Sequence, residues 1–99
     1  MSHFTEVETR FKDADCLIAA LKEVLNPKTR KPFKEVHHYP TAQNLKGYRG
    51  DTRPQTAEII IHKKDIGSLS NDIGFKRQSN GEYIAYISEY DSKQVGFNE

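Results

Sequence analysis

The residues best suited to binding chemistry lie close together in the middle of the chain, around the sequence "KGYRGDTRPQTAEIII". Tyr48 and Arg49 stand between two glycines, and Arg53 follows. Aromatic rings among positive charges are typical of surfaces that hold single-stranded nucleic acid, because bases stack on the rings and cations attract phosphates. Tyrosine and arginine also anchor many protein–protein interfaces. Our candidate binding residues are Tyr39, Lys46, Tyr48, Arg49 and Arg53.

The two glycines, Gly47 and Gly50, form a GxxG element that has two interpretations. In KH domains such an element joins two helices and clamps a nucleic-acid backbone, but the flanks here, "TAQNLK" and "DTRPQT", are poor helix formers. The simpler alternative is a turn into a strand, in which the glycines are needed only for their backbone angles. In that case Asp51 would pair with Arg49 or Arg53 and make the turn rigid.

The positive charge of the chain is concentrated in the segment that holds these residues. Residues 27–56 contain seven lysines and arginines and two acidic residues, a balance of +5, whereas residues 1–26 and 57–99 each have a balance of −2. The whole chain has a formal net charge of only +1. A local excess of this kind can mark an anion-binding surface, although a solvated polar loop would have the same composition.

The histidines give little support to a metal site. His37 and His38 are adjacent, so in a strand they point to opposite faces and cannot comfortably share one ion. His3 and His62 could join one of them only if the fold brought them together. The spacings of familiar zinc sites, H-E-x-x-H and CxxC, do not occur in the sequence. We therefore expect no metal site and no cofactor.

The acidic pairs and the single cysteine have ordinary structural explanations. Glu6 and Glu8 share one face of a predicted strand, and Asp13 and Asp15 stand at the start of a predicted helix. Paired carboxylates work as acid and base where their environments differ in burial, and we expect these pairs to be exposed. Cys16 is interpreted as a small core residue rather than a nucleophile. The protein is therefore not expected to be an enzyme.

Length and composition indicate one small domain, residues 1–99. Hydrophobic residues make up 35% of the chain and the mean hydropathy is −0.79, but ten aromatic residues and clear apolar runs argue against disorder. One cysteine excludes an internal disulfide and fits a reducing compartment. No apolar run approaches the roughly 20 residues of a membrane span, and the N-terminus is too polar for a secretory signal. We expect a cytoplasmic or plastid-stromal protein without a membrane partner.

The N-terminal quarter predicts a strand followed by a helix. Residues 3–11 alternate between apolar or β-branched side chains and charged ones, which indicates a half-buried strand. Apolar residues then recur at helical spacing from Leu17 to Leu25. Asp13 is expected to cap this helix, and Asn26-Pro27 to end it.

The middle of the chain contains one weak strand signal and one strong one. A short strand is predicted near Val36–Tyr39, and Pro40 either ends it or places it at an edge. Leu45 is the only large aliphatic residue before the next strand, so residues 40–56 are predicted to form a long surface loop. The strand at residues 57–63 is expected to be central, because both of its faces are partly apolar.

Residues 71–90 are predicted to form a β-hairpin with Asn80-Gly81 as a two-residue type I′ turn. The same register places Gly74 opposite Ile87, where the missing side chain would allow a close approach. The pairs that this turn imposes are Ser79 with Glu82, Arg77 with Ile84, Phe75 with Tyr86 and Ile73 with Ser88. The tail after residue 90 is polar and is expected to fray.

These elements predict an α+β fold: a mainly antiparallel sheet of four to five strands with one helix packed on one face. The order strand, helix, strand at the start makes the fold partly ferredoxin-like, although the second helix of that fold is missing.

Three stretches resemble a family of small proteins of cyanobacteria and algal plastids, known as a hypothetical chloroplast reading-frame family with a domain of unknown function. They are "MSHFTEVETRFKDADCLIAALKEV", "GYRGDTR" with "AEIII", and "NDIGFKRQSNGEYIAYISEYD", in the same order along most of the chain. Sequences of that family continue into a further helix, whereas this one stops at Glu99. We expect either a natural short member, as in a cyanophage, or a chain cut before that helix. The family supplies no catalytic residues.

The function expected from these features is that of a small non-enzymatic protein-interaction module, which docks on a protein complex through the "GYRGDTR" loop and an open sheet face. The partner is unidentified, and the open face could also join two copies of the chain. The alternative is RNA or single-stranded DNA binding through the basic and aromatic segment at residues 27–56.

Overall fold

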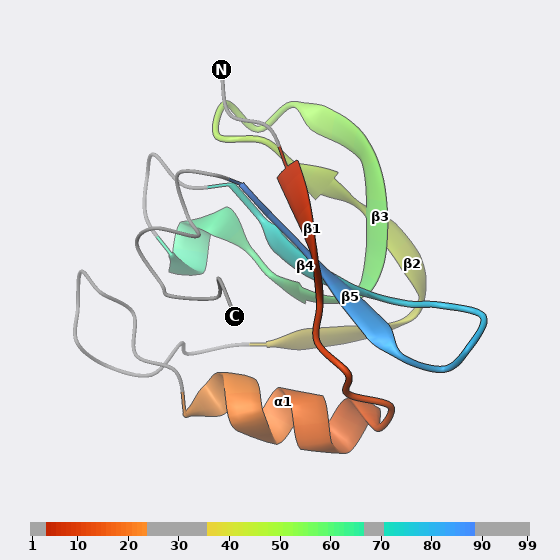
Figure 1. The fold of residues 1–99 in the computed structure, drawn as a ribbon. Helices are drawn as coiled ribbons and strands as arrows, with labels where there is room; N and C mark the ends of the chain where they lie inside the picture. The colour runs from red at the N-terminus through yellow and green to blue at the C-terminus, as the bar shows by residue number, and fades with distance from the viewer. Residues whose placement is uncertain (1–3, 24–35, 67–70, 89–99) are drawn as a thin grey trace.

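The computed structural model of the chain describes residues 4–23, 36–66 and 71–88, and shows an α+β fold with a five-stranded antiparallel sheet and one α-helix (Figure 1). The elements in chain order are β1 (Phe4–Glu8), α1 (Ala14–Lys22), β2 (His37–Lys46), β3 (Thr52–Ile61), the short 3₁₀ helix η1 (Lys63–Asp65), β4 (Ile73–Arg77) and β5 (Tyr83–Ser88).

The strand order β1-β5-β4-β3-β2 confirms the predicted fold class but not its ferredoxin-like part. Strands β2 to β5 follow one another as antiparallel neighbours, and β1 returns to pair with β5. In the split βαβ unit of a ferredoxin-like fold, only one strand lies between the two strands that flank the first helix, whereas three strands lie between β1 and β2. Here they are the two opposite edges of the sheet, so the ferredoxin-like prediction was wrong.

Strand β1 and helix α1 follow the sequence pattern closely. Along β1, Glu6 and Glu8 are exposed while Phe4, Thr5 and Val7 are half-buried. The Asp13 carboxylate caps α1 by accepting hydrogen bonds from the backbone N–H groups of Asp15 and Cys16. The helix ends at Lys22, earlier than the predicted stop at Asn26-Pro27, which lies outside the described residues.

The sheet buries side chains on both faces. The face under α1 holds the larger cluster, which consists of Leu17, Leu21, Ile59, Ile61, Ile66, Ile73, Phe75, Tyr83, Ala85 and Ile87. On the other face Leu45, Ala57 and Ile60 are fully buried, with Tyr86 and two further aromatic rings packed around them. Strand β3 supplies both faces, so the prediction of a central strand is confirmed.

The β4–β5 hairpin forms as predicted, but its turn is different. Gly81 has a positive φ of 89°, Asn80 does not, and the Gly81 N–H donates to the carbonyl of Gln78 at 2.9 Å. This is a three-residue loop closed by a left-handed glycine, not a type I′ turn. The loop is one residue longer than predicted, so the register shifts by one and Gly74 lies opposite Tyr86 rather than Ile87. The other observed pairs are Phe75 with Ala85, Lys76 with Ile84 and Arg77 with Tyr83.

The predicted loop at residues 40–56 is instead most of a second hairpin, formed by β2 and β3. The prediction failed because β2 is an edge strand with few buried side chains, so it lacks an apolar alternation. Its edge position agrees with the interpretation of Pro40, which a central strand would not tolerate. Leu45, predicted to lie in the loop, is fully buried.

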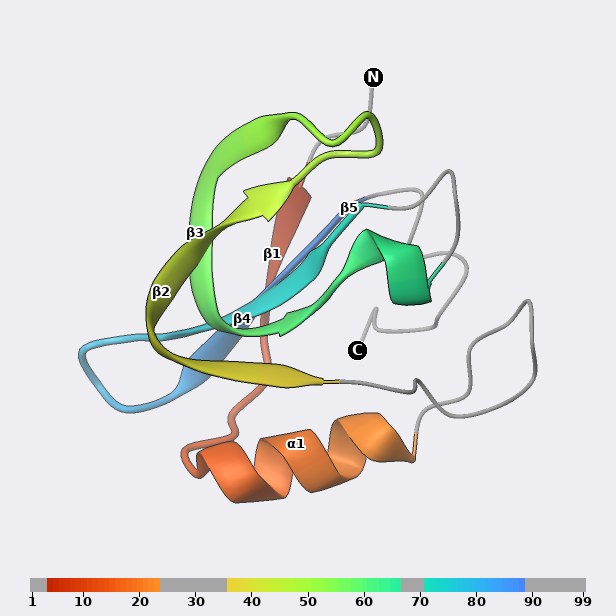
Figure 2. The same ribbon diagram turned by 180° about the vertical axis from the view of Figure 1, so that it is seen from behind.

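The β2–β3 hairpin curls strongly over the rest of the sheet, as both views show (Figures 1 and 2). Its ladder is interrupted by two register shifts, one between His38 and Gln43 and one between Asn44 and Lys46. Such irregularities bend and twist a hairpin. Pro40 lies within the first shift and Pro54 opposite the second, where a missing N–H breaks no ladder bond.

The described part of the chain has no helix with the length and apolar character needed to cross a bilayer.

Candidate functional site

The tip of the β2–β3 hairpin carries the GxxG element and is a well-defined turn. The Gly50 N–H donates to the Gly47 carbonyl at 2.9 Å, and the Gly47 N–H donates to the Asp51 carbonyl at 2.8 Å. Gly50 has a φ of 79°, which side chains avoid, and a Cβ on Gly47 would come within 2.5 Å of the Asp51 side chain. Gly50 is therefore needed for its backbone angle, whereas Gly47 leaves room for the Asp51 side chain. The element joins two strands rather than the two helices of a KH clamp.

The two arginines of the tip are each held on an aromatic ring. The Arg49 guanidinium lies 5.3 Å from the centroid of the Tyr48 ring, and its Nε donates to the Tyr48 hydroxyl at 2.9 Å. Arg53 lies 5.3 Å from the centroid of the Phe4 ring, on β1, and also pairs with Asp51 at 3.8 Å. The predicted pairing of Asp51 is thus with Arg53. A hollow of ≈ 470 Å³ is lined by Tyr48, Arg49, Asp51 and Arg53.

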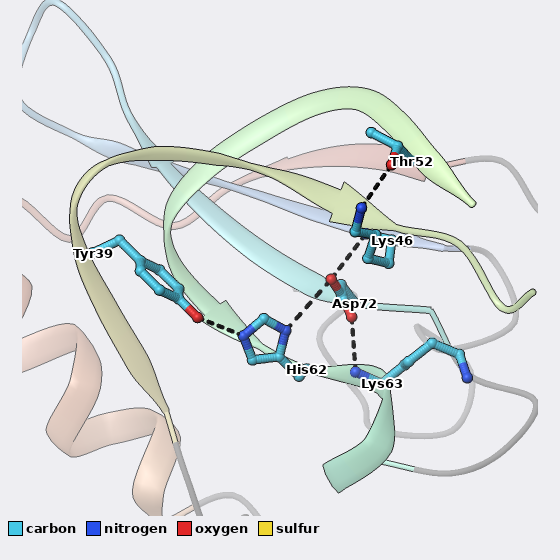
Figure 3. A network of polar contacts seen from close by, with 6 residues as sticks. All are labelled: Tyr39, Lys46, Thr52, His62, Lys63 and Asp72. Atoms are coloured by element: carbon cyan, nitrogen blue, oxygen red, sulfur yellow. Dashed lines mark hydrogen bonds and ion pairs between the residues drawn. The ribbon is translucent and has the colours of Figure 1, made fainter. Parts of the chain in front are cut away.

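Of the five predicted site residues, Tyr39 lies apart from the tip. It sits in the first half of β2, with its hydroxyl 2.7 Å from Nε2 of His62 (Figure 3). The Tyr39 ring stacks on His37 with centroids 5.9 Å apart. Lys46 is at the end of β2, next to the tip, and its ammonium donates to Thr52 Oγ1 at 2.6 Å. The structure therefore brings Lys46, Tyr48, Arg49 and Arg53 together and places Tyr39 in a separate cluster.

A second hollow, of ≈ 310 Å³, includes Lys46 together with residues that were not predicted as site residues. It is lined by Lys46, Gly50, His62, Lys63, Lys64 and Asp72. Lys46 and Lys64 are exposed, His62 and Lys63 are half-buried, and Asp72 is 1% exposed. The hollow therefore presents three lysines and one imidazole to solvent.

Asp72 holds the parts of this second hollow together. Its Oδ2 accepts the backbone N–H of Lys46 at 2.8 Å, and its Oδ1 accepts the backbone N–H of Lys63 at 2.8 Å (Figure 3). Its own N–H donates to the Lys46 carbonyl at 2.9 Å. One buried carboxylate thus joins the end of β2 to the start of η1, which lie at opposite ends of the β2–β3 ladder.

His62 connects the hollow to the β2 aromatic cluster. Its Nδ1 lies 3.6 Å from Asp72 Oδ2, and its ring meets the His37 ring edge-on with centroids 4.8 Å apart. The Asp72 carboxylate favours the tautomer with the proton on Nδ1, and in that tautomer Nε2 accepts a hydrogen bond from the Tyr39 hydroxyl. Tyr39, His62 and Asp72 thus form a chain of polar contacts at the edge of the hollow (Figure 3).

The one cysteine and two tyrosines of β5, which are side chains that can act in catalysis, are not among the described residues that line the hollows. Cys16 is exposed on α1, so its interpretation as a core residue was wrong, because only Leu17 and Leu21 of that helix are buried. Burial raises the pKa of the Tyr83 hydroxyl, and burial together with nearby Glu6 raises the pKa of Tyr86. Both phenols therefore stay protonated at neutral pH. Within the described residues no cluster of three His, Cys, Asp or Glu side chains could hold a metal ion.

Comparison with protein-family models, with curated proteins and with solved structures found no match. The resemblance to the cyanobacterial and plastid family therefore stays a prediction, and the function has to be argued from the geometry alone.

The residues that sequence reasoning missed are His62, Lys63, Lys64 and Asp72. The one available signal was the pair Lys63-Lys64 directly after the strongest strand, since residues at strand ends often meet. Its contact with Lys46 could not be predicted, because it depends on the curl of the hairpin and on the link through Asp72.

Proposed function

We propose that this protein binds single-stranded nucleic acid, without catalysing a reaction, through the tip of the β2–β3 hairpin. The observation that carries the proposal is the convergence of basic side chains from two separate segments. Lys46, Arg49 and Arg53 come from the basic segment, and Lys63 and Lys64 join them from η1, outside that segment. The two hollows thus border one cationic surface.

The chemistry of the tip suits an unpaired strand better than a duplex. Arg49 and Tyr48 form one stacked unit, and a base can stack on such a guanidinium or ring plane. The lysines flank this unit and can neutralise phosphates on either side, which makes binding depend on salt. Two acids are among the described residues that line the hollows. Asp72 is buried and Asp51 pairs with Arg53, so neither carboxylate is placed to repel a phosphate that the lysines attract.

The test is fluorescence anisotropy of labelled 12-nucleotide single-stranded RNA and DNA, titrated with the protein from low to physiological salt. We expect micromolar or tighter binding at low salt with a steep salt dependence. Arg49→Ala and Arg53→Ala should each weaken binding and reduce the salt slope by about 0.7 to 1, the effect of one lost phosphate contact. Arg77→Ala, at the exposed end of β4, is the matched control and should change neither.

Flat anisotropy at high protein concentration in low salt would overturn the proposal. Equal loss with Arg77→Ala would show that only overall charge matters. If poly-glutamate displaced the strand at equal charge concentration, the surface would be a general polyanion site rather than one selective for nucleic acid.

A protein-interaction module is the second candidate, and one observation favours it. Arg49 and Arg53 are already immobilised on aromatic rings, so they would lose little conformational freedom as interface anchors. The curled hairpin covers Leu45, Ala57 and Ile60 on one face of the sheet. The tip is therefore a better candidate contact surface for a partner than this sheet face. A partner captured from a cyanobacterial extract by the wild type but not by the Arg49→Ala, Arg53→Ala double variant would support it. Capture of no reproducible partner would contradict it.

A further inference from the structure

The hollow beside η1 has a composition that the hairpin tip does not share. Among the described residues, three lysines and a histidine line it and no tyrosine or phenylalanine does, so it offers cations rather than a large stacking surface. Its basic residues come from two places, Lys46 at the end of β2 and the pair Lys63 and Lys64 in η1. Such a site suits the phosphate of a strand rather than a base.

Asp72, the one acid among the described residues that line the hollow, is turned away from a ligand. Asp72 is 1% exposed, and its two oxygens accept the backbone N–H groups of Lys46 and Lys63. Its charge is therefore partly balanced within the protein, and its remaining neighbour is the His62 ring. An anion entering the hollow would meet the lysine ammonium groups and the imidazole, not the carboxylate.

His62 supplies the histidine ring of the hollow, and histidine is the side chain that proteins commonly use as a proton-linked switch. The titratable and charged groups around it are Tyr39, His37 and Lys46 from β2, Lys63 and Lys64 from η1, and Asp72 before β4. Asp72 attracts the extra proton, the lysines oppose it, and Tyr39 can accept from Nε2–H after it binds. A phosphate in the hollow would favour the proton as well.

We propose that this hollow is a phosphate subsite for the bound strand, and that it binds the phosphate more tightly when His62 is protonated. The inference rests on the proposed function and adds a second contact point to it. By linkage, each bound strand takes up part of a proton, so affinity increases as the pH falls. The tip residues Arg49 and Arg53 keep their charge throughout and supply the binding that does not depend on pH.

The experiment measures anisotropy of a labelled 12-nucleotide oligothymidylate without terminal phosphates, at constant salt, from pH 7.5 to 5.5. Neither thymine nor the phosphodiester titrates in this range, so a change in affinity reports the protein. We expect affinity to increase about three- to tenfold over the interval, within the limit of one proton per complex. His62→Gln should remove this increase.

Two further variants separate the subsite from general effects. His38→Gln removes an exposed histidine of β2 that points away from the hollow, and should keep the full pH dependence. The Lys63→Gln, Lys64→Gln double variant should lower affinity several-fold and reduce the salt slope by about 1 to 2. Lys22→Gln, at the exposed end of α1 and outside the lining of the hollow, is its control.

The outcomes distinguish this inference from the proposed function. If the strand does not bind at any pH, the proposed function fails and the subsite with it. If binding depends on Arg49 and Arg53 but not on pH, His62 or the η1 lysines, only the subsite is overturned.

His62 could also act only by stabilising the fold, and further measurements distinguish that role from phosphate binding. Tyr39→Phe removes the partner of His62 but leaves its charge, so the pH effect on binding should persist. If pH alters thermal unfolding but not affinity, His62 acts only in the fold. Should His62→Gln fail to fold, the η1 double variant decides: unchanged affinity and salt slope would overturn the subsite.

Discussion

Single glycines decide how closely the strands of this molecule approach one another. Gly74, in the middle of β4, lies under the side chains of Leu45 and Ala57, so that a Cβ there would be 2.6 Å from Leu45 Cδ2 and 2.8 Å from Ala57 Cβ. Those neighbours belong to the curled hairpin, which could not close over β4 if residue 74 had a side chain. The absence of one side chain therefore permits the curl that brings Lys46 to Asp72.

At this scale we predict that Gly74→Ala destabilises the protein by about 1–3 kcal/mol, the usual cost of overpacking a buried site. Gly47→Ala is the matched comparison, because its Cβ would meet only the side chain of exposed Asp51, which can rotate away. Urea unfolding followed by circular dichroism measures both. Equal, small losses would mean that the hairpin does not pack on β4 as tightly as these distances require.

Among the elements, the two hairpins share one turn design although their sequences differ. Gly50 and Gly81 have φ values of 79° and 89°, and each donates its N–H to the carbonyl three residues earlier, in Gly47 and Gln78. The sequence predicted that a turn would occur at Asn80-Gly81, but its register was missed because Asn-Gly commonly forms a shorter turn. The residue types Asn and Gly are compatible with both a two-residue and a three-residue loop, so they do not by themselves predict the length of the loop.

The element-scale prediction concerns this turn. Gly81→Ala should destabilise the protein by about 1–2 kcal/mol, because an alanine in the left-handed region strains its backbone. A steric clash would not contribute, because nothing lies within 4 Å of the added Cβ. Gly81→Asn should cost less, since asparagine tolerates that region better. Thermal or urea unfolding checks the order. A type I′ turn would also require the left-handed region at residue 80, so Asn80→Ala would then be as harmful as Gly81→Ala, whereas the observed turn predicts a small effect.

For the whole molecule, the curl of the sheet is the feature that the sequence does not predict, and the second hollow depends on it. The alternation in β1, the cap at Asp13 and the isoleucines of β3 are local signals, and each predicted its element correctly. The basic tip was also predicted, because Tyr48 and Arg49 are adjacent in the chain. The hollow with His62 was not, because Lys46 and Lys63 belong to opposite ends of one ladder and meet only after two register shifts bend it.

The same curl carries the tip of the hairpin to the start of β1, where Arg53 lies over Phe4 (Figure 2). This contact joins the second strand from one edge of the sheet to the strand at the opposite edge, so it forms only if the sheet bends as a whole. A double-mutant cycle of Phe4→Leu and Arg53→Gln should therefore show a coupling of about 0.5–1 kcal/mol in urea unfolding, the range for an exposed cation–π pair. Phe4→Leu combined with Arg49→Gln is the control and should be additive within about 0.3–0.5 kcal/mol, because Arg49 stacks on Tyr48 instead. Additivity in the first cycle would place the tip away from β1 in solution. The hollow that Arg53 lines with Tyr48 would then lack the support of β1 before a ligand binds.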